Sequence, residues 1–218
     1  MTLALAALIA FQGQSEPPSV GVNHTDGMRS AYSGRPALEV LHQSARCIVG
    51  RNRAASIRLI ATIPDTLGEW RILYGPIRSR LDQCSMMGVS VTNALLRGAI
   101  AEALLETAFP VVPAPAQAVA VAPIAWPRGH RSAPNLAPIY ELGRCVVARD
   151  PRRVARLLAA EPFSSDESQA MRALSPTLQP CLDQGTTFNT NRETLRAILS
   201  EALYRWASAQ PRTPTRAE

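Results

Sequence analysis

Hydrophobic residues near the C-terminus recur every three or four positions, which is the spacing of one face of an α-helix. This stripe consists of Leu195, Ile198, Leu199, Ala202, Leu203 and Trp206. A stripe of the same spacing in the first half of the chain consists of Leu96, Ala99, Ile100, Ala103 and Leu104. No stretch alternates hydrophobic and polar residues over the length of a strand. The pattern therefore predicts an all-α fold.

Helix start and stop signals divide the second half of the chain further. A first predicted helix carries Leu142, Cys145 and Val146 on one face. Asp150 followed by Pro151 is typical of a helix start, so a second helix is expected there, with its end before Pro162. Hydrophobic positions in this second helix are Val154, Leu157 and Leu158.

Two capping boxes predict the starts of the remaining helices. Ser164 and Glu167 fit a capping box that opens a third helix, which runs to Cys181 with an interruption at Pro176. Thr190 and Glu193 fit a second capping box at the start of the fourth helix. Each half therefore reads as about four helices, since the first half matches this pattern.

The two halves also resemble each other in sequence. The segment ARCIVGR around Cys47 returns 98 residues later as GRCVVAR around Cys145. With the same or a neighbouring offset, the matching pairs are Arg46/Arg144, Arg51/Arg149, Arg58/Arg156, Leu59/Leu157, Pro64/Pro162, Arg97/Arg196 and Glu102/Glu201. We interpret this as two tandem homologous helical units, at 37–109 and 137–208.

The four cysteines keep their spacing in both halves. Cys47 and Cys84 are 37 residues apart, and Cys145 and Cys181 are 36 apart. The spacing predicts one disulfide in each unit, joining the first helix to the end of the third. A swapped arrangement, Cys47 with Cys181 and Cys84 with Cys145, obeys the same symmetry and remains the alternative. A zinc site is disfavoured because no closely spaced ligand pair occurs.

Residues 110–136 connect the units and are rich in proline and alanine. Proline at this frequency disfavours helix interiors and central strands, which predicts an extended, semi-rigid linker. The segment AVAVAPIAW within it contains a tryptophan and several branched hydrophobic residues. It could alternatively dock as an extended chain on a helical surface.

The first 15 residues resemble a signal peptide in outline, with a hydrophobic run from Leu3 to Phe11 followed by small residues at Gly13 and Ser15. A buried N-terminal helix is the alternative, and the run is too short to span a bilayer. Residues 16–36 read as a flexible lead-in and 209–218 as a disordered tail. Together with the paired cysteines, this predicts a periplasmic or secreted protein without a transmembrane segment.

The charge is carried by an unusual set of residues. All 23 basic residues are arginine, and the formal net charge is +6. The arginines that recur in both halves define a candidate anion-binding face, which consists of Arg46, Arg51, Arg58, Arg97, Arg144, Arg149, Arg156 and Arg196. The competing interpretation is structural: Arg97 and Glu102 lie on neighbouring turns of one helix and could form a solvated ion pair.

Catalytic chemistry finds little support in the sequence. No phosphate-binding glycine loop, metal-binding carboxylate pair or HExxH motif occurs. His24 and Asp26 lie close together, but in the predicted flexible lead-in, where such residues are usually solvated. No metal or other cofactor is expected, and we do not expect an enzyme.

These observations predict a non-catalytic binding module of the cell envelope, with a groove between its two units. The expected partner is another envelope protein or an anionic ligand. The alternative is a polyanion or nucleic-acid binder that uses the repeated arginines. An enzyme with an active site between the units is the third possibility.

Overall fold

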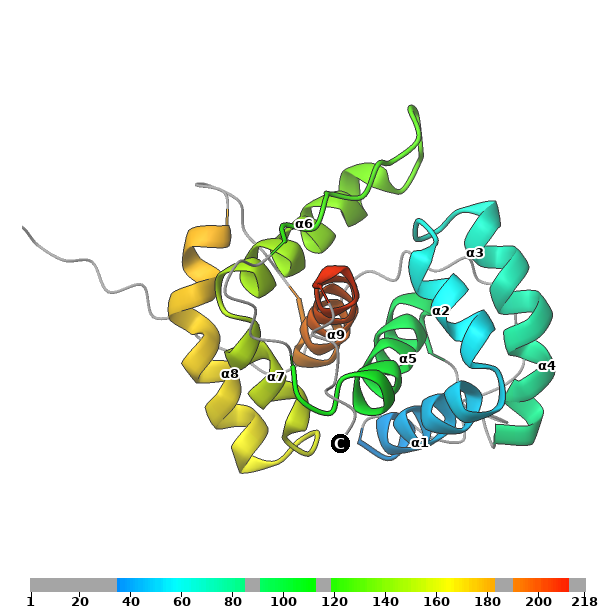
Figure 1. The fold of residues 1–218 in the computed structure, drawn as a ribbon, viewed down its shortest axis with the longest axis horizontal. Helices are drawn as coiled ribbons and strands as arrows, with labels where there is room; N and C mark the ends of the chain where they lie inside the picture. The colour runs from blue at the N-terminus through cyan, green and yellow to red at the C-terminus, as the bar shows by residue number, and fades with distance from the viewer. Residues whose placement is uncertain (1–34, 85–90, 113–118, 183–189, 212–218) are drawn as a thin grey trace, which may run out of the picture.

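The computed structural model describes residues 35–84, 91–112, 119–182 and 190–211. In these residues it contains helices and connecting segments and no strand, so the all-α prediction is confirmed (Figure 1). The N-terminal half contains α1 (Arg35–Arg51), α2 (Arg53–Ala61), α3 (Leu67–Ile72), η1 (Leu73–Ile77), α4 (Arg78–Leu81), η2 (Asp82–Cys84) and α5 (Asn93–Ala108). The C-terminal half contains α6 (Ala133–Arg149), α7 (Pro151–Ala159), α8 (Ser165–Leu178), η3 (Gln179–Cys181) and α9 (Arg192–Ala209).

Helices α5 and α9 occupy the centre of the molecule, with α1 to α4 on one side and α6 to α8 on the other (Figure 1). They approach each other closely at Gly98, where an added Cβ atom would lie 2.3 Å from the Cα atom of Ala197. Only glycine fits this contact without displacing backbone. Buried residues of both halves, including Ile100 and Leu199, belong to one hydrophobic core.

Corresponding polar residues cap corresponding helices. Asn52 accepts a hydrogen bond from Ala55 N at the start of α2, as Asp150 does from Arg153 N at the start of α7. These contacts satisfy backbone donors that have no partner within the helix. The predicted start at Asp150 is therefore confirmed.

Of the two predicted capping boxes, one agrees with the structure and the other is displaced. Ser164 caps α8 by accepting from Glu167 N, as predicted. At α9 the cap is Asn191, which accepts from Thr194 N, so the prediction of Thr190 is wrong by one residue. Asparagine and threonine both cap helices well, and adjacent candidates cannot be separated by residue type alone.

The predicted interruption at Pro176 is wrong, because α8 continues through this residue to Leu178. Pro176 is exposed at the surface. Water can therefore satisfy the carbonyl that loses its partner when proline replaces a residue with an N–H group. In the N-terminal half Pro76 lies instead within the π-helical segment η1.

Two disulfides tie the first helix of each half to the end of its third helical segment. Cys47 in α1 is bonded to Cys84 in η2, with Cα atoms 5.6 Å apart. Cys145 in α6 is bonded to Cys181 in η3, with Cα atoms 5.7 Å apart. The predicted pairing within each half is confirmed, and the swapped alternative is wrong.

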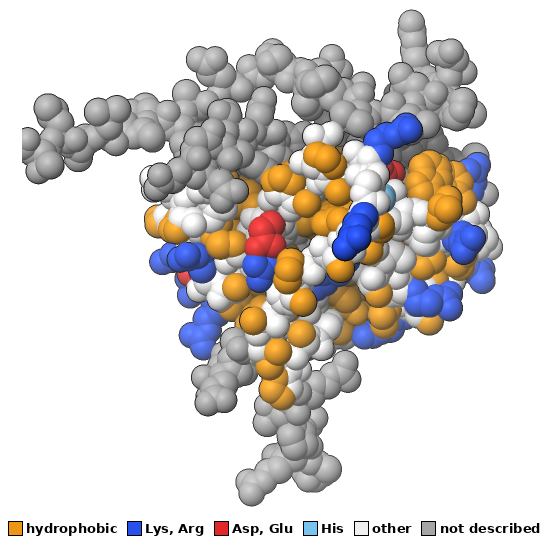
Figure 2. Space-filling model, turned by 90° about the horizontal axis from the view of Figure 1, so that it is seen from above, with side chains coloured by type: hydrophobic (Ala, Val, Ile, Leu, Met, Phe, Trp, Pro, Cys, Tyr) orange, Lys and Arg blue, Asp and Glu red, His pale blue; other side chains and the backbone are white. Residues whose placement is uncertain are grey.

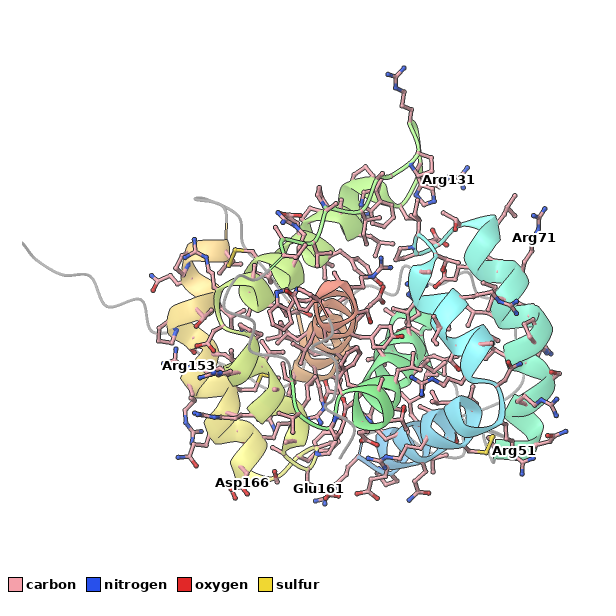
Figure 3. All side chains as sticks on the ribbon, viewed as in Figure 1. Arg51, Arg71, Arg131, Arg153, Glu161 and Asp166 are labelled. Atoms are coloured by element: carbon pink, nitrogen blue, oxygen red, sulfur yellow. A yellow bond between two sulfur atoms is a disulfide. The ribbon has the colours of Figure 1, made fainter. Side chains whose placement is uncertain are left out.

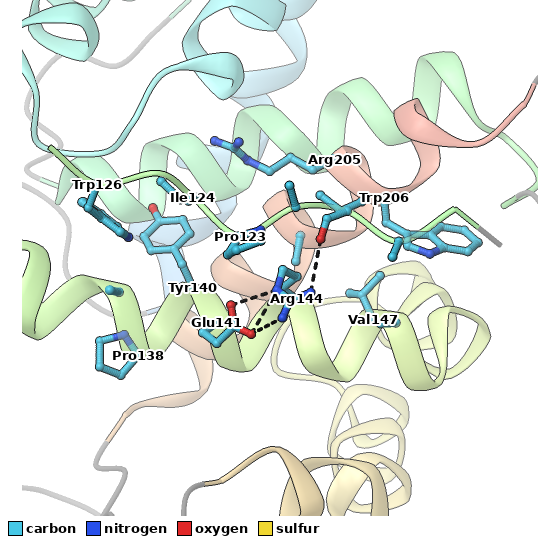
Figure 4. Close-up of a pocket in the computed structure, with 16 residues that line it drawn as sticks. Pro123, Ile124, Trp126, Pro138, Tyr140, Glu141, Arg144, Val147, Arg205 and Trp206 are labelled. Carbon is cyan, nitrogen blue, oxygen red and sulfur yellow. Dashed lines mark hydrogen bonds and ion pairs between the residues drawn. The ribbon is translucent and has the colours of Figure 1, made fainter.

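Residues 119–126 run extended across α6 and α9 (Figures 1 and 4). The side chain of Gln210 accepts from Val119 N at 2.8 Å and donates to Val119 O at 3.0 Å. Arg144 donates to Val121 O at 3.2 Å. This part of the linker follows the docked alternative, because its backbone and side chains are held on the helical surface.

The element boundaries differ slightly from those expected. Helix α1 already begins at Arg35, and α6 begins at Ala133 within the segment that we assigned to the linker. The predicted signal peptide, most of the lead-in and most of the tail lie outside the described residues. Among the described helices, none combines the length and hydrophobicity needed to cross a membrane.

Candidate functional site

Arg97 and Arg196, two of the arginines predicted for an anion-binding face, lie in the interior. Their exposed fractions are 0% and 4%. Both are surrounded by carboxylates and backbone carbonyls from other helices. These two guanidinium groups are therefore bound by protein groups in the interior.

Arg97 on α5 joins both halves of the molecule. Its Nε and Nη2 atoms donate to the carboxylate of Glu201 on α9 at 3.0 and 2.6 Å. Its Nη1 atom donates to Glu69 Oε1 at 3.2 Å and to Leu59 O at 3.0 Å. The two-pronged contact with Glu201 fits the planar guanidinium and fixes its orientation.

Arg196 makes the corresponding contacts from α9 to α5. Its Nε and Nη2 atoms donate to the carboxylate of Glu102 on α5 at 3.1 and 2.7 Å. Its Nη1 atom donates to Glu167 Oε1 at 3.0 Å and to Leu157 O at 3.1 Å. We call these two groups of residues the Arg97 cluster and the Arg196 cluster.

The expectation of a solvated ion pair between Arg97 and Glu102 within one helix is wrong. Each arginine instead contacts the glutamate of the other central helix, in a buried environment. The pairing crosses because α5 and α9 lie against each other near Gly98 and Ala197. Sequence spacing within a helix carries no information on such a contact.

Burial and charge oppose each other in the Arg97 cluster. Burial lowers the pKa of Arg97, but Glu201, Tyr140 and Glu69 together raise it by more, so the net pKa lies above its ordinary value. Burial raises the pKa of Glu201, yet Arg97 and Arg205 lower it by more, and the net pKa is lowered. Both groups are therefore charged at neutral pH, and removing either would leave an uncompensated buried charge.

Glu69 completes the Arg97 cluster and was not singled out from the sequence. It lies 98 residues before Glu167, so each half carries a glutamate at the same position. This recurrence was the available signal. In both halves the carboxylate also accepts from the backbone upstream of its helix, from Asp65 N and from Phe163 N.

One pair of equivalent neighbours, His42 and Tyr140, differs between the two clusters. His42 Nδ1 lies 3.6 Å from Glu102, whereas Tyr140 donates its hydroxyl to Glu201 at 3.4 Å. Burial lowers the pKa of His42 and outweighs the attraction of Glu102, which favours the neutral imidazole. Burial and the Glu201 charge raise the pKa of Tyr140, so it remains a hydroxyl donor.

A groove of about 680 Å³ lies between the halves, with α1 and α5 on one side and α7 on the other. Its lining includes His42, Glu102 and Arg196, which connects the groove to the Arg196 cluster. Arg46 and Glu106 form a partly exposed ion pair at 2.8 Å within the same lining. We call this the open groove.

A second cavity, of about 340 Å³, lies between residues 120–126 and the surfaces of α6 and α9 (Figure 4). Tyr140 and Arg144 of α6 line it, together with Arg205 and Trp206 of α9. The Trp126 ring packs edge-on against Tyr140, with centroids 6.2 Å apart. The extended segment thus covers this helical surface, which we call the covered groove.

The other predicted site arginines do not gather on one face. Of the eight, the open groove brings together Arg46, Arg156 and Arg196. Arg144 lines the covered groove, and Arg51, Arg58 and Arg149 are exposed on α1, α2 and α6. The face in Figure 2 shows arginines scattered among hydrophobic residues, and Figure 3 places Arg51 and Arg153 on opposite sides.

The described residues contain no group of three or more side chains suited to hold a metal ion. All four cysteines are engaged in the disulfides. His24 and Asp26 lie outside the described residues. Comparison with known proteins gives no match: no protein-family model, no curated protein and no solved structure is significantly similar to this chain.

Proposed function

We propose that the protein is a non-catalytic binding module, built from two tandem homologous helical units, whose ligand site is the open groove. The observation that carries this proposal is the groove itself. It lies where the two units meet, and the buried ion pairs of the Arg196 cluster fix part of its lining. A rigid, preorganised site reduces the entropy lost on binding.

The tandem-unit interpretation is supported by matching contacts. Arg97 and Arg196 bind equivalent carbonyls, at Leu59 and Leu157, and equivalent glutamates, at Glu69 and Glu167. The disulfides and the caps at Asn52 and Asp150 also correspond. A duplicated unit accounts for these shared contacts together.

We further propose that the protein acts in an oxidising compartment, as a periplasmic or secreted component of the cell envelope. Two disulfides support this location because thiols are kept reduced in the cytosol. Thiol titration of the protein from its native host, denatured without reductant, should find no free thiol. Four free thiols would contradict the location.

The charge of the open groove bears on the polyanion alternative. Four glutamates and four arginines line it, the glutamates being Glu39, Glu102, Glu106 and Glu161 and the arginines Arg46, Arg152, Arg156 and Arg196. A balanced lining gives no net attraction for a polyanion. The groove therefore favours a ligand without high charge.

A fragment screen observed through the protein's own NMR signals tests the binding proposal. Fragments should bind preferentially in the open groove and shift signals of its lining, such as those of Ala155 and Phe109. Ala159→Trp should obstruct the groove, because Ala159 lies exposed in its lining. Ala61→Trp is the matched control, since Ala61 is exposed at the corresponding end of α2. Fragments that bind the Ala159→Trp variant as well as the unchanged protein would contradict the proposal.

A further inference from the structure

The covered groove shows how this fold holds an extended chain. Residues 119–126, with the sequence VAVAPIAW, lie across α6 and α9. Their backbone is fixed by Gln210 at Val119 and by Arg144 at Val121. Hydrophobic side chains such as Val121 and Trp126 face the helices, packing against the core and against Tyr140.

The residues beneath this segment have counterparts in the open groove. Tyr140, Arg144 and Ala137 of α6 correspond, at an offset of 98, to His42, Arg46 and Glu39 of α1, all of which line the open groove. Arg205 of α9 corresponds, at an offset of 99, to Glu106 of α5 in the same lining. The α1 and α5 side of the open groove is thus equivalent to the α6 and α9 surface of the covered groove.

The two equivalent arginines bind a glutamate through the same donor atoms, although the glutamate lies on the same helix for Arg144 and on α5 for Arg46. Arg144 binds Glu141 through Nε and Nη2, which leaves Nη1 to donate to Val121 O. Arg46 binds Glu106 through Nε and Nη2, at 2.8 and 2.9 Å. Within the described residues its Nη1 atom has no hydrogen-bond acceptor. This is the donor that captures a backbone carbonyl in the covered groove.

We infer that the open groove binds an extended peptide segment of a partner protein, rich in alanine, valine and proline, with a backbone carbonyl accepting from Arg46. This inference rests on the proposed function and names its ligand class. The balanced charge of the groove suits a peptide of this composition. Hydrophobic contact is available from Phe109 and from Val111, whose side chain is 82% exposed. The position equivalent to Gln210, at an offset of 99, is Val111 in the open groove. Valine has no side-chain hydrogen-bonding group, so Arg46 supplies the main hydrogen bond to the peptide backbone.

Binding of a synthetic VAVAPIAW peptide to the full-length protein tests the inference. The fluorescein-labelled peptide should bind saturably at one site, measured by fluorescence anisotropy. Arg46→Gln and Ala159→Trp should each weaken binding by about tenfold or more, since the first removes the anchor and the second obstructs the groove. Ala61→Trp should leave the affinity unchanged. A peptide with glutamate at the positions of Val119, Val121 and Ile124 should not bind.

The outcomes separate this inference from the proposal beneath it. Fragments that map to the open groove, without peptide binding, would overturn the peptide ligand and leave the binding function standing. If neither the fragments nor the peptide bind, both the peptide ligand and the binding function are overturned. Dimerisation of the protein that is lost in Ala159→Trp, measured by sedimentation, would assign the groove to a second copy of this chain and overturn the partner protein.

Discussion

The N-terminal and C-terminal halves share their interior and differ at their surface. In both, a buried arginine of one central helix binds a glutamate of the other and a second glutamate from its own half. The grooves next to these clusters differ, because one is open and the other lies beneath residues 119–126. The contacts that agree are therefore those whose loss would leave buried charges without partners, and the face that differs is the one that we propose to bind a ligand.

The largest expected effect comes from the buried arginines. Arg97→Met should lower the free energy of unfolding by about 3 to 5 kcal/mol, because Glu69 then lacks a charged partner and Glu201 keeps only Arg205. The loss in Arg196→Met should be similar. There Glu102 loses its arginine, and Glu167 keeps Arg192.

Urea denaturation of both variants measures the two losses. The exposed residue Arg149 provides the control, and Arg149→Met should change the free energy of unfolding by less than about 0.5 kcal/mol. A much larger loss in one of the two arginine variants would show that Arg205 and Arg192 do not compensate the remaining carboxylates equally.

The disulfides should have nearly equal effects in the two halves. They span 37 and 36 residues, so removing either by a double cysteine-to-alanine change should cost about 3 to 4 kcal/mol through loop-closure entropy. Thermal unfolding of the Cys47/Cys84 and Cys145/Cys181 double variants gives the measurement. A much larger cost for one disulfide would mean that its half depends on the covalent link for more than chain entropy.

The smallest effect concerns His42 and Tyr140, the neighbours that distinguish the clusters. The pKa of His42 is lowered in the folded protein, and the groups that face it are Glu102, Arg196, Arg46 and Glu106. The unfolded chain therefore binds more protons as the pH falls through the ordinary histidine pKa of about 6.5. This contribution to stability is present above that pH and is lost progressively below it.

His42→Tyr copies the C-terminal arrangement into the N-terminal half and should remove this contribution. Urea midpoints at about pH 7.5 and about pH 5.5 should therefore differ less in His42→Tyr than in the unchanged protein. All other side chains are the same in both proteins, so the comparison isolates the contribution of residue 42. An unchanged pH dependence would exclude His42 as its source.

Parts of this structure could be predicted from the sequence because they depend on local or repeated signals. The helices follow from hydrophobic spacing, and the pairing of Cys47 with Cys84 follows from the equal intervals in both halves. The recurrence of Arg97 and Glu102 was also visible. Their partners were not, because the crossing of α5 and α9 at Gly98 is a property of tertiary packing.

The candidate site was less accessible to sequence reasoning. A groove between the halves was expected, but neither its lining nor its connection to His42 follows from helical periodicity. The anion-binding face relied on recurrence alone, and recurrence does not distinguish the buried Arg196 from the exposed Arg149. Burial depends on which helix faces which, and that requires the fold.

The close contact of Gly98 with Ala197 bears on the origin of the molecule. Under the proposed duplication, a single ancestral unit would have held its arginine with only one of its two carboxylate partners. The missing carboxylate would have come from an identical subunit related by a twofold axis, which describes an obligate homodimer. On this proposal, joining the two subunits in one polypeptide would have made assembly independent of concentration. It would also have allowed one of two formerly identical faces to acquire an internal occupant while the other stayed free to evolve.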